Sequence, residues 1–192
     1  MLAGELSVSW EREIATCLEA VLPLGAGESR IDLGRLARIE AHRPAGHRVV
    51  TAHPKIIADD PGLATWASRA WDPNTAPDAD TTVALTETVV GHAIASLADA
   101  SADQVVLCHW HDKRSKREVD HVMCHPGGRF VPIEAKASTS ISPRDTTGLR
   151  AFIAEVPTKT HQALAIYEGD QIVDLTPPVN GPPIFGLPRT LL

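Results

Sequence analysis

Apolar residues recur every three or four positions in the first part of the chain, a spacing typical of amphipathic helices. It predicts one helix over residues 8–22 and a second over 31–41, with Ile39 among the apolar positions of the second. The polar segment 41–48 (AHRPAGHR) is typical of a loop or linker. We therefore expect residues 1–50 to form a small helical appendage or to be the remnant of a linker region.

Residues 51–176 mix helical spacing with short runs of aliphatic residues, which predicts alternating helices and strands. This order is typical of an α/β (α+β) protein with a central mixed sheet flanked by helices. We expect the Pro-rich residues 177–192 to be an irregular tail. Strands are predicted at 55–58, 104–110, 118–125, 130–137 and as a pair within 163–175. Helices are predicted from about 63, over 82–99 with Leu85, Val89, Ile94 and Leu97 packing on the sheet, and over 144–154.

Composition and charge narrow the class of protein. The 192 residues are 43% hydrophobic and 22% charged, as in an ordinary globular domain. A formal net charge of −6 excludes a protein that coats nucleic acid through bulk positive charge, although a local basic patch stays compatible with it. Three cysteines without framework spacing favour a reducing, cytoplasmic setting. The chain shows no secretory signal and no apolar run long enough for a membrane span.

Acidic residues lie in the middle of two predicted strands whose other residues are mostly of the apolar kind found in protein cores. Asp120 lies within the predicted strand 118–125, and Glu134 and Lys136 lie within 130–137. Buried carboxylates are costly unless they pair with a cation or bind a metal. Carboxylate oxygens suit Mg²⁺ or Mn²⁺, and a nearby lysine can assist a water molecule that attacks a phosphodiester. The alternative is a Glu–Lys pair on a solvent-exposed sheet face.

The number of residues that connect these two strands sets whether Asp120, Glu134 and Lys136 can lie on the same face of the sheet. A two-residue Gly127-Gly128 turn would pair positions whose numbers add to 255, and Asp120 would then face away from Glu134 and Lys136. A shared face requires an even sum, such as 254 or 256. We therefore predict a connection of three or five residues at 126–129, or a bulge beside it, with Gly127 or Gly128 in a left-handed conformation.

Two further clusters lie on the same hairpins. The turn DKRSKR carries Lys113, Arg114, Lys116 and Arg117, which could contact a phosphate backbone; the alternative is a solvated hairpin tip. Cysteines and histidines between positions 108 and 125 could suggest zinc. No C-x₂-C pair occurs, and strand alternation sends Cys108 and His109 to opposite faces. We therefore expect these residues to be buried or at a sheet edge without a metal.

The order of helix acid, strand aspartate and E-x-K resembles the PD-(D/E)xK nuclease superfamily. More narrowly, residues 53–175 resemble the carboxyl-terminal domain of unknown function found in many bacterial AAA-like ATPases. Four blocks carry this resemblance in order: HPKIIADDPGLATW, LTETVVGHAI, LCHWHDKRSKREVDHVM and VPIEAKASTSISPRDTTGLRAF. No G-x-x-x-x-G-K-[ST] motif of the ATPase module occurs, so we expect no nucleotide hydrolysis.

The resemblance implies a restriction-endonuclease-like core and a Mg²⁺- or Mn²⁺-dependent nuclease acting on DNA. By position, Glu87 matches the helix acid, Asp120 and Glu134 the strand acids, and Lys136 the catalytic lysine. Glu87, Asp120 and Glu134 would then hold the metal, and their mutual repulsion predicts a raised pKa for at least one of them. The alternative is a non-catalytic, antitoxin-like module that binds a protein partner or a second copy of itself.

Overall fold

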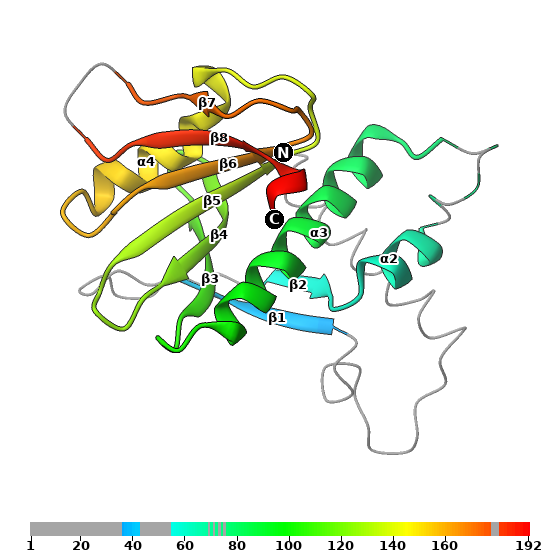
Figure 1. Ribbon diagram of the computed structural model, residues 1–192, viewed down its shortest axis with the longest axis horizontal. Coiled ribbons are helices and arrows are strands. Elements are labelled where there is room, and N and C mark those ends of the chain that lie inside the picture. The colour runs from blue at the N-terminus through cyan, green and yellow to red at the C-terminus, as the bar shows by residue number, and fades with distance from the viewer. Residues whose placement is uncertain are drawn as a thin grey trace. The chain divides into compact units, whose positions relative to one another are not determined.

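The computed structural model describes residues 36–42, 55–68, 76–177 and 181–192, together with positions 70, 72 and 74. Figure 1 labels the helices and strands of these residues. The chain divides into two compact units. The first contains residues 1–38 and 56–92, and the second contains 39–55 and 93–192. Among the described helices, none is long and apolar enough to cross a membrane.

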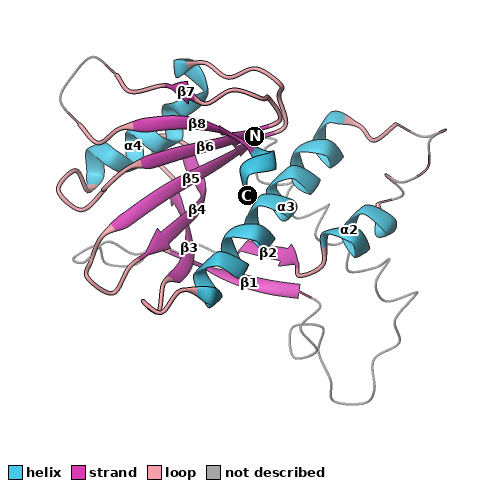
Figure 2. Cartoon of the chain, viewed as in Figure 1, coloured by secondary structure: helices cyan, strands magenta, loops and turns pink. Residues whose placement is uncertain are grey.

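An eight-stranded mixed sheet runs through the described residues (Figure 2), which confirms the mixed α/β class. Strands β3, β4 and β5 are antiparallel neighbours, whereas β1 pairs parallel with β3, and β6 pairs parallel with β5. The order across the sheet is β2-β1-β3-β4-β5-β6-β8-β7. The strands are β1 (Leu36–Ala41), β2 (Lys55–Ala58), β3 (Val106–Asp112), β4 (Arg117–Cys124), β5 (Phe130–Lys136), β6 (Ala163–Tyr167), β7 (Val173–Asp174) and β8 (Ile184–Pro188).

The helix predicted over 31–41 is wrong where the structure describes it, because residues 36–41 form strand β1. Glu40 and Ala41 pair with residues of β3, and Ile39 is buried. Apolar spacing alone cannot distinguish a short helix from a strand whose pairing partner lies far along the chain. The helix predicted over 8–22 lies outside the described residues, as does most of the predicted loop 41–48.

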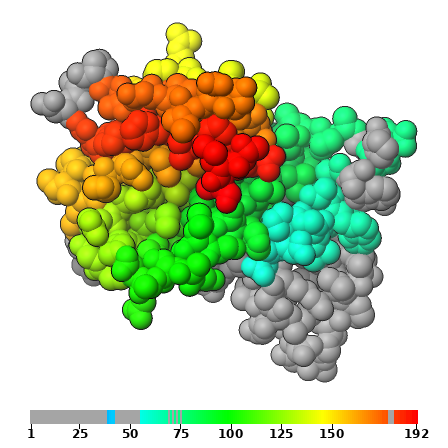
Figure 3. All heavy atoms as spheres, in the orientation of Figure 1, coloured from blue at the N-terminus to red at the C-terminus, as the bar shows by residue number. Residues whose placement is uncertain are grey.

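The carboxyl-terminal segment also differs from its prediction. Residues 184–188 form strand β8 rather than an irregular tail, and β8 lies between β6 and β7. The predicted strand pair within 163–175 is therefore not a hairpin, since each of its strands pairs with β8 instead. Prolines flank this strand without interrupting it, and Pro188 occupies its last position, where a ladder hydrogen bond is not needed. In Figure 3 the red carboxyl-terminal residues lie beside orange residues that precede them in the chain.

The helices largely follow their predictions. Helix α2 (Pro61–Ala67) starts two residues earlier than predicted, because the Asp60 side chain caps it and Pro61 fits its first turn. Helix α3 (Ala79–Ala100) confirms the helix over 82–99, and α4 (Thr147–Glu155) follows a short 3₁₀ turn, η1 (Pro143–Thr146). A second 3₁₀ turn, η2 (Arg189–Leu191), lies near the carboxyl terminus. Ile94 is buried as predicted, whereas Leu97 is 53% exposed; the buried positions of α3 include Thr86, Thr88, Val90, Ile94 and Ala98.

The main core of the second unit lies between α4 and strands β4 and β5. Leu149 and Phe152 of α4 are fully buried there, as is Val122 of β4. The register between β3 and β4 shifts between Cys108 and Trp110, so β4 has one extra residue at Asp120 and His121. A bulge of this kind bends the strand and re-aims the side chains beside it. The bulge therefore stands where β4 presents its acidic residue.

Candidate functional site

The connection between β4 and β5 has the geometry that the acidic cluster requires. His121 pairs with Ile133 and Cys124 with Phe130, so paired positions add to 254. The His125 backbone N–H donates to the Arg129 carbonyl over 2.9 Å, which leaves three residues, 126–128, in the connection. Gly128 is left-handed, with φ of 73°. The predicted odd-numbered connection is thereby confirmed, with three residues rather than five, and continuing this register places Asp120 opposite Glu134.

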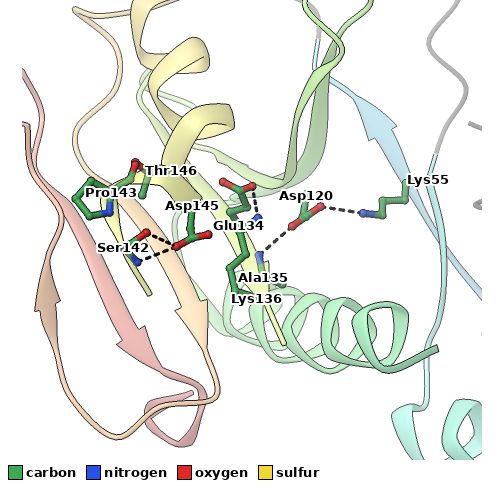
Figure 4. A network of polar contacts seen from close by, with 9 residues as sticks. All are labelled: Lys55, Asp120, Glu134, Ala135, Lys136, Ser142, Pro143, Asp145 and Thr146. Carbon is green, nitrogen blue, oxygen red and sulfur yellow. Dashed lines mark hydrogen bonds and ion pairs between the residues drawn. The ribbon is translucent and has the colours of Figure 1, made fainter. Parts of the chain in front are cut away.

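Asp120 is held at the centre of the cluster by two donors. Its Oδ2 accepts a hydrogen bond of 2.9 Å from the backbone N–H of Ala135, and its Oδ1 lies 3.3 Å from the Lys55 ammonium (Figure 4). Only 7% of the Asp120 side chain is exposed. Burial by itself raises the pKa of this carboxyl, but the charge of Lys55, with His121 and the Ala135 N–H, outweighs burial and lowers the pKa. Asp120 is therefore an ionised, anchored carboxylate.

Glu134 has the opposite electrostatic character. Its Oε1 accepts a hydrogen bond of 2.7 Å from Lys136, whereas its Oε2 is buried and has no hydrogen-bond partner among the described residues. Burial raises the pKa of Glu134 to about 7, against the attraction of Lys136, and the charges of Asp120 and Glu118 raise it further. The predicted raised pKa is confirmed, although burial rather than repulsion is its largest cause. Glu134 can therefore gain or lose a proton near neutral pH.

Lys136 lies beside Glu134 on β5, with 31% of its side chain exposed. Burial lowers its pKa, but the carboxylates of Glu134, Asp120 and Asp145 outweigh burial and raise it. The ammonium is therefore charged at neutral pH and partly accessible to solvent. This combination suits a group that holds a water molecule or an anionic oxygen.

The start of α4 packs closely against the cluster. A Cβ atom at Gly148 would collide with the Glu118 carbonyl oxygen and would lie 3.5 Å from Glu134 Oε2, so only glycine allows this approach. Asp145 precedes α4, and its carboxylate accepts hydrogen bonds of 2.8 and 2.7 Å from the backbone N–H and hydroxyl of Ser142. Figure 4 shows Asp145 on the side of the cluster opposite Lys55.

The remaining predicted residues lie elsewhere. Glu87 is a half-buried residue of α3 in the first unit, and its role as a metal ligand stays a prediction. The four basic residues of the β3–β4 turn are exposed, and Asp112 orders this turn by accepting hydrogen bonds from Arg114 and Ser115. The basic residues are Lys113, Arg114, Lys116 and Arg117.

Two members of the cluster escaped the sequence analysis. Lys55 stands 65 residues before Asp120, and only the lysine in the block HPKIIADDPGLATW offered a signal for it. Asp145 stands nine residues after Lys136, in a segment that reads as a helix start, and no local pattern distinguished it from a capping acid.

Comparisons with known proteins identify a family. Residues 83–181 match the family described as "Domain of unknown function (DUF4143)". The match includes Glu87, Asp120, Glu134, Lys136 and Asp145, whereas Lys55 and strand β8 lie outside it. No curated protein and no solved structure matches the chain. Because the match spans just over half of the 192 residues, this protein, with its cluster of paired acids and lysines, belongs to the DUF4143 family.

Proposed function

We propose that this protein is a metal-dependent hydrolase of the PD-(D/E)xK type that cleaves phosphodiester bonds in DNA. The observation that carries the proposal is the buried Oε2 of Glu134, which has no hydrogen-bond partner among the described residues. A buried carboxylate oxygen without a partner is costly. A cation shared with Asp120 would remove that cost.

The donors fit a hard divalent cation. Asp120 and Glu134 supply carboxylate oxygens, which Mg²⁺ and Mn²⁺ prefer over sulfur or imidazole ligands. The chemistry that such an ion supplies is polarisation of the scissile phosphate and activation of a water molecule.

The remaining roles in the reaction belong to the protein's own residues. Lys136, partly exposed and charged, orients the attacking water and stabilises the negative charge that develops on the phosphate. Lys55 and the Ala135 N–H fix the Asp120 carboxylate in one orientation, so Lys55 is a positioning residue. Glu134, with a pKa of about 7, exchanges a proton near the pH at which hydrolysis would occur.

The exposed basic turn is the surface that we propose for DNA. Four cations in one ordered turn give a local positive patch on a chain whose net charge is −6. Such a patch would position the phosphate backbone without reading base sequence.

The test is cleavage of plasmid and linear DNA by the purified full chain with Mg²⁺ or Mn²⁺. We expect Lys136→Ala to lower the cleavage rate at least about a hundredfold, as loss of a charge-stabilising group does. Lys159→Ala is the matched control, since this lysine is exposed. Both variants must have the same unfolding temperature as the wild type, which shows that they are folded. Unchanged cleavage by Lys136→Ala, or no cleavage by the wild type with either ion, would contradict the proposal.

One observation favours a second candidate, a non-catalytic partner-binding module. Asp120 and Glu134 each already pair with a lysine, as buried acids with a purely structural role would do. In that case calorimetry would show no uptake of Mg²⁺ or Mn²⁺ by the folded protein, and Asp120→Asn would change stability without changing any metal response.

A further inference from the structure

A second group of potential ligands lies on the described strands, apart from the acids. The side chains of His42, Cys108 and Cys124 each offer one ligand atom, and these atoms all lie within 4.8 Å of one another. His42 follows β1, Cys108 lies on β3 and Cys124 ends β4. The residues thus come from three neighbouring strands that are far apart in sequence.

Strand register brings the three side chains to one face. Cys108 pairs with Glu40, and His42 stands two residues beyond Glu40, on the same side of β1. Cys124 pairs with Val106, two residues from Cys108, so the two sulfurs are diagonal neighbours on one face. The backbone N–H of His42 donates to the His109 carbonyl over 2.6 Å, which fixes the histidine beside β3.

The spacing suits a tetrahedral ion. Cys124 Sγ lies 3.6 Å from His42 Nδ1. With metal–sulfur bonds of about 2.3 Å and metal–nitrogen bonds of about 2.0 Å, tetrahedral ligands are separated by roughly 3.5–3.8 Å. The observed separation therefore already falls in the range that zinc requires, and the second sulfur lies within reach of small side-chain rotations.

We propose that His42, Cys108 and Cys124 bind a zinc ion. Two sulfurs and one imidazole are soft and borderline ligands, which favour Zn²⁺ over Mg²⁺. Three protein ligands leave a fourth position for water or another ligand. The ion would link the residue that follows β1 to the β3–β4 hairpin. It would therefore stabilise the pairing of β1, a strand that the sequence analysis predicted as part of a helix.

The surroundings favour metal binding over other roles for these side chains. The His42 ring lies 4.6 Å from the Phe130 ring and 5.7 Å from the Phe152 ring, measured between centroids. His42 Nε2 is buried without a hydrogen-bond partner among the described residues, so turning the ring towards the ion breaks no hydrogen bond there.

Two measurements on the full chain test the site. The protein is stripped with a chelator, kept reduced with a phosphine, and titrated with Zn²⁺ and separately with Co²⁺. We expect one equivalent of zinc to survive dialysis and to raise the unfolding temperature. We also expect Co²⁺ to give a thiolate-to-metal charge-transfer band, which carboxylate ligands do not produce. A folded protein that shows no such band overturns the proposal.

Variants assign the ligands. Cys108→Ser, Cys124→Ser and His42→Ala should each lower zinc affinity at least about tenfold, and either cysteine change should weaken the cobalt band. The control His125→Asn should leave both unchanged, since His125 instead pairs with Asp103 at 3.2 Å. If a cysteine variant does not fold, protection of two of the three thiols from a thiol reagent by Zn²⁺ replaces it. Equal thiol reactivity with and without Zn²⁺ would also overturn the proposal.

Discussion

Strand β4 carries two chemically different clusters only four residues apart. At Asp120 the neighbouring groups are carboxylates and lysines, whereas at Cys124 they are a thiol, an imidazole and aromatic rings. The acidic cluster contains its own cations, Lys55 and Lys136, at 3.3 and 2.7 Å from the carboxylates. No lysine or arginine pairs with the His42–Cys108–Cys124 group in any ion pair found among the described residues.

This difference shows how one sheet can offer sites for two classes of metal. The ionised Asp120 needs positive charge at all times, so lysines stabilise it whether or not a metal is bound. The thiols can stay partly neutral in an apolar setting, and they need positive charge only once both have lost their protons. Hard ions such as Mg²⁺ should therefore bind at the acidic cluster, and softer ions such as Zn²⁺ should bind at the His42–Cys108–Cys124 group.

The largest expected effect is that a substitution in one cluster changes the property of that cluster and leaves the property of the other unchanged. Asp120→Asn should lower Mg²⁺-dependent cleavage at least about a hundredfold, because it removes an anionic ligand, while the cobalt band stays unchanged. Cys108→Ser should weaken the cobalt band and leave cleavage within about twofold of the wild type. Cleavage assays and absorption spectra on the same preparations measure both. Loss of both properties in either folded variant would show that the clusters form one site.

A smaller effect concerns the pH dependence of stability. Burial raises the pKa of Glu134 from 4.5 to about 7, so the folded state binds a proton more tightly than the unfolded state. This contribution is fully present below about pH 4.5 and is lost as pH rises through 7. Without metal, Glu134→Gln should therefore gain stability over the wild type by up to about 3 kcal/mol at pH 8.

Urea unfolding in a chelating buffer at about pH 5 and pH 8 measures this gain. The Lys159→Met variant serves as a control, because this exposed residue lies outside the acidic cluster. A wild type and a Glu134→Gln variant with parallel stability curves over this range would mean that Glu134 titrates at its ordinary pKa.

The smallest of the three effects involves Lys55. Lys55→Met leaves the buried Asp120 carboxylate without its ion pair, which should cost about 2 kcal/mol of unfolding free energy at neutral pH. Mg²⁺ should restore more stability to this variant than it adds to the wild type, since the ion supplies the missing charge. Thermal unfolding with and without Mg²⁺ measures the rescue, and Lys159→Met is the control. No rescue would favour the structural reading of the Asp120–Lys55 pair.

The acidic hairpin could be predicted from the order of residues along the chain. Asp120, Glu134 and Lys136 lie within 17 residues of one another, and a strand period of two fixes which of them share a face. Because a shared site requires paired positions with an even sum, the sequence predicted a connection of three or five residues or a bulge, and the structure selects the three-residue turn with Gly128 left-handed. The long helix α3 was equally predictable, since its apolar period extends over many turns.

Tertiary structure decided what depends on distant partners. Strand β1 forms because β3 pairs with it, although the apolar spacing of its residues is typical of a helix. Strand β8 forms between β6 and β7, although the prolines around it are typical of an irregular segment. The same long-range pairing brings His42 to two cysteines and Lys55 to Asp120. A contact across 65 residues leaves no periodic signal in one sequence, because it is set by the order of strands in the sheet rather than by neighbours along the chain.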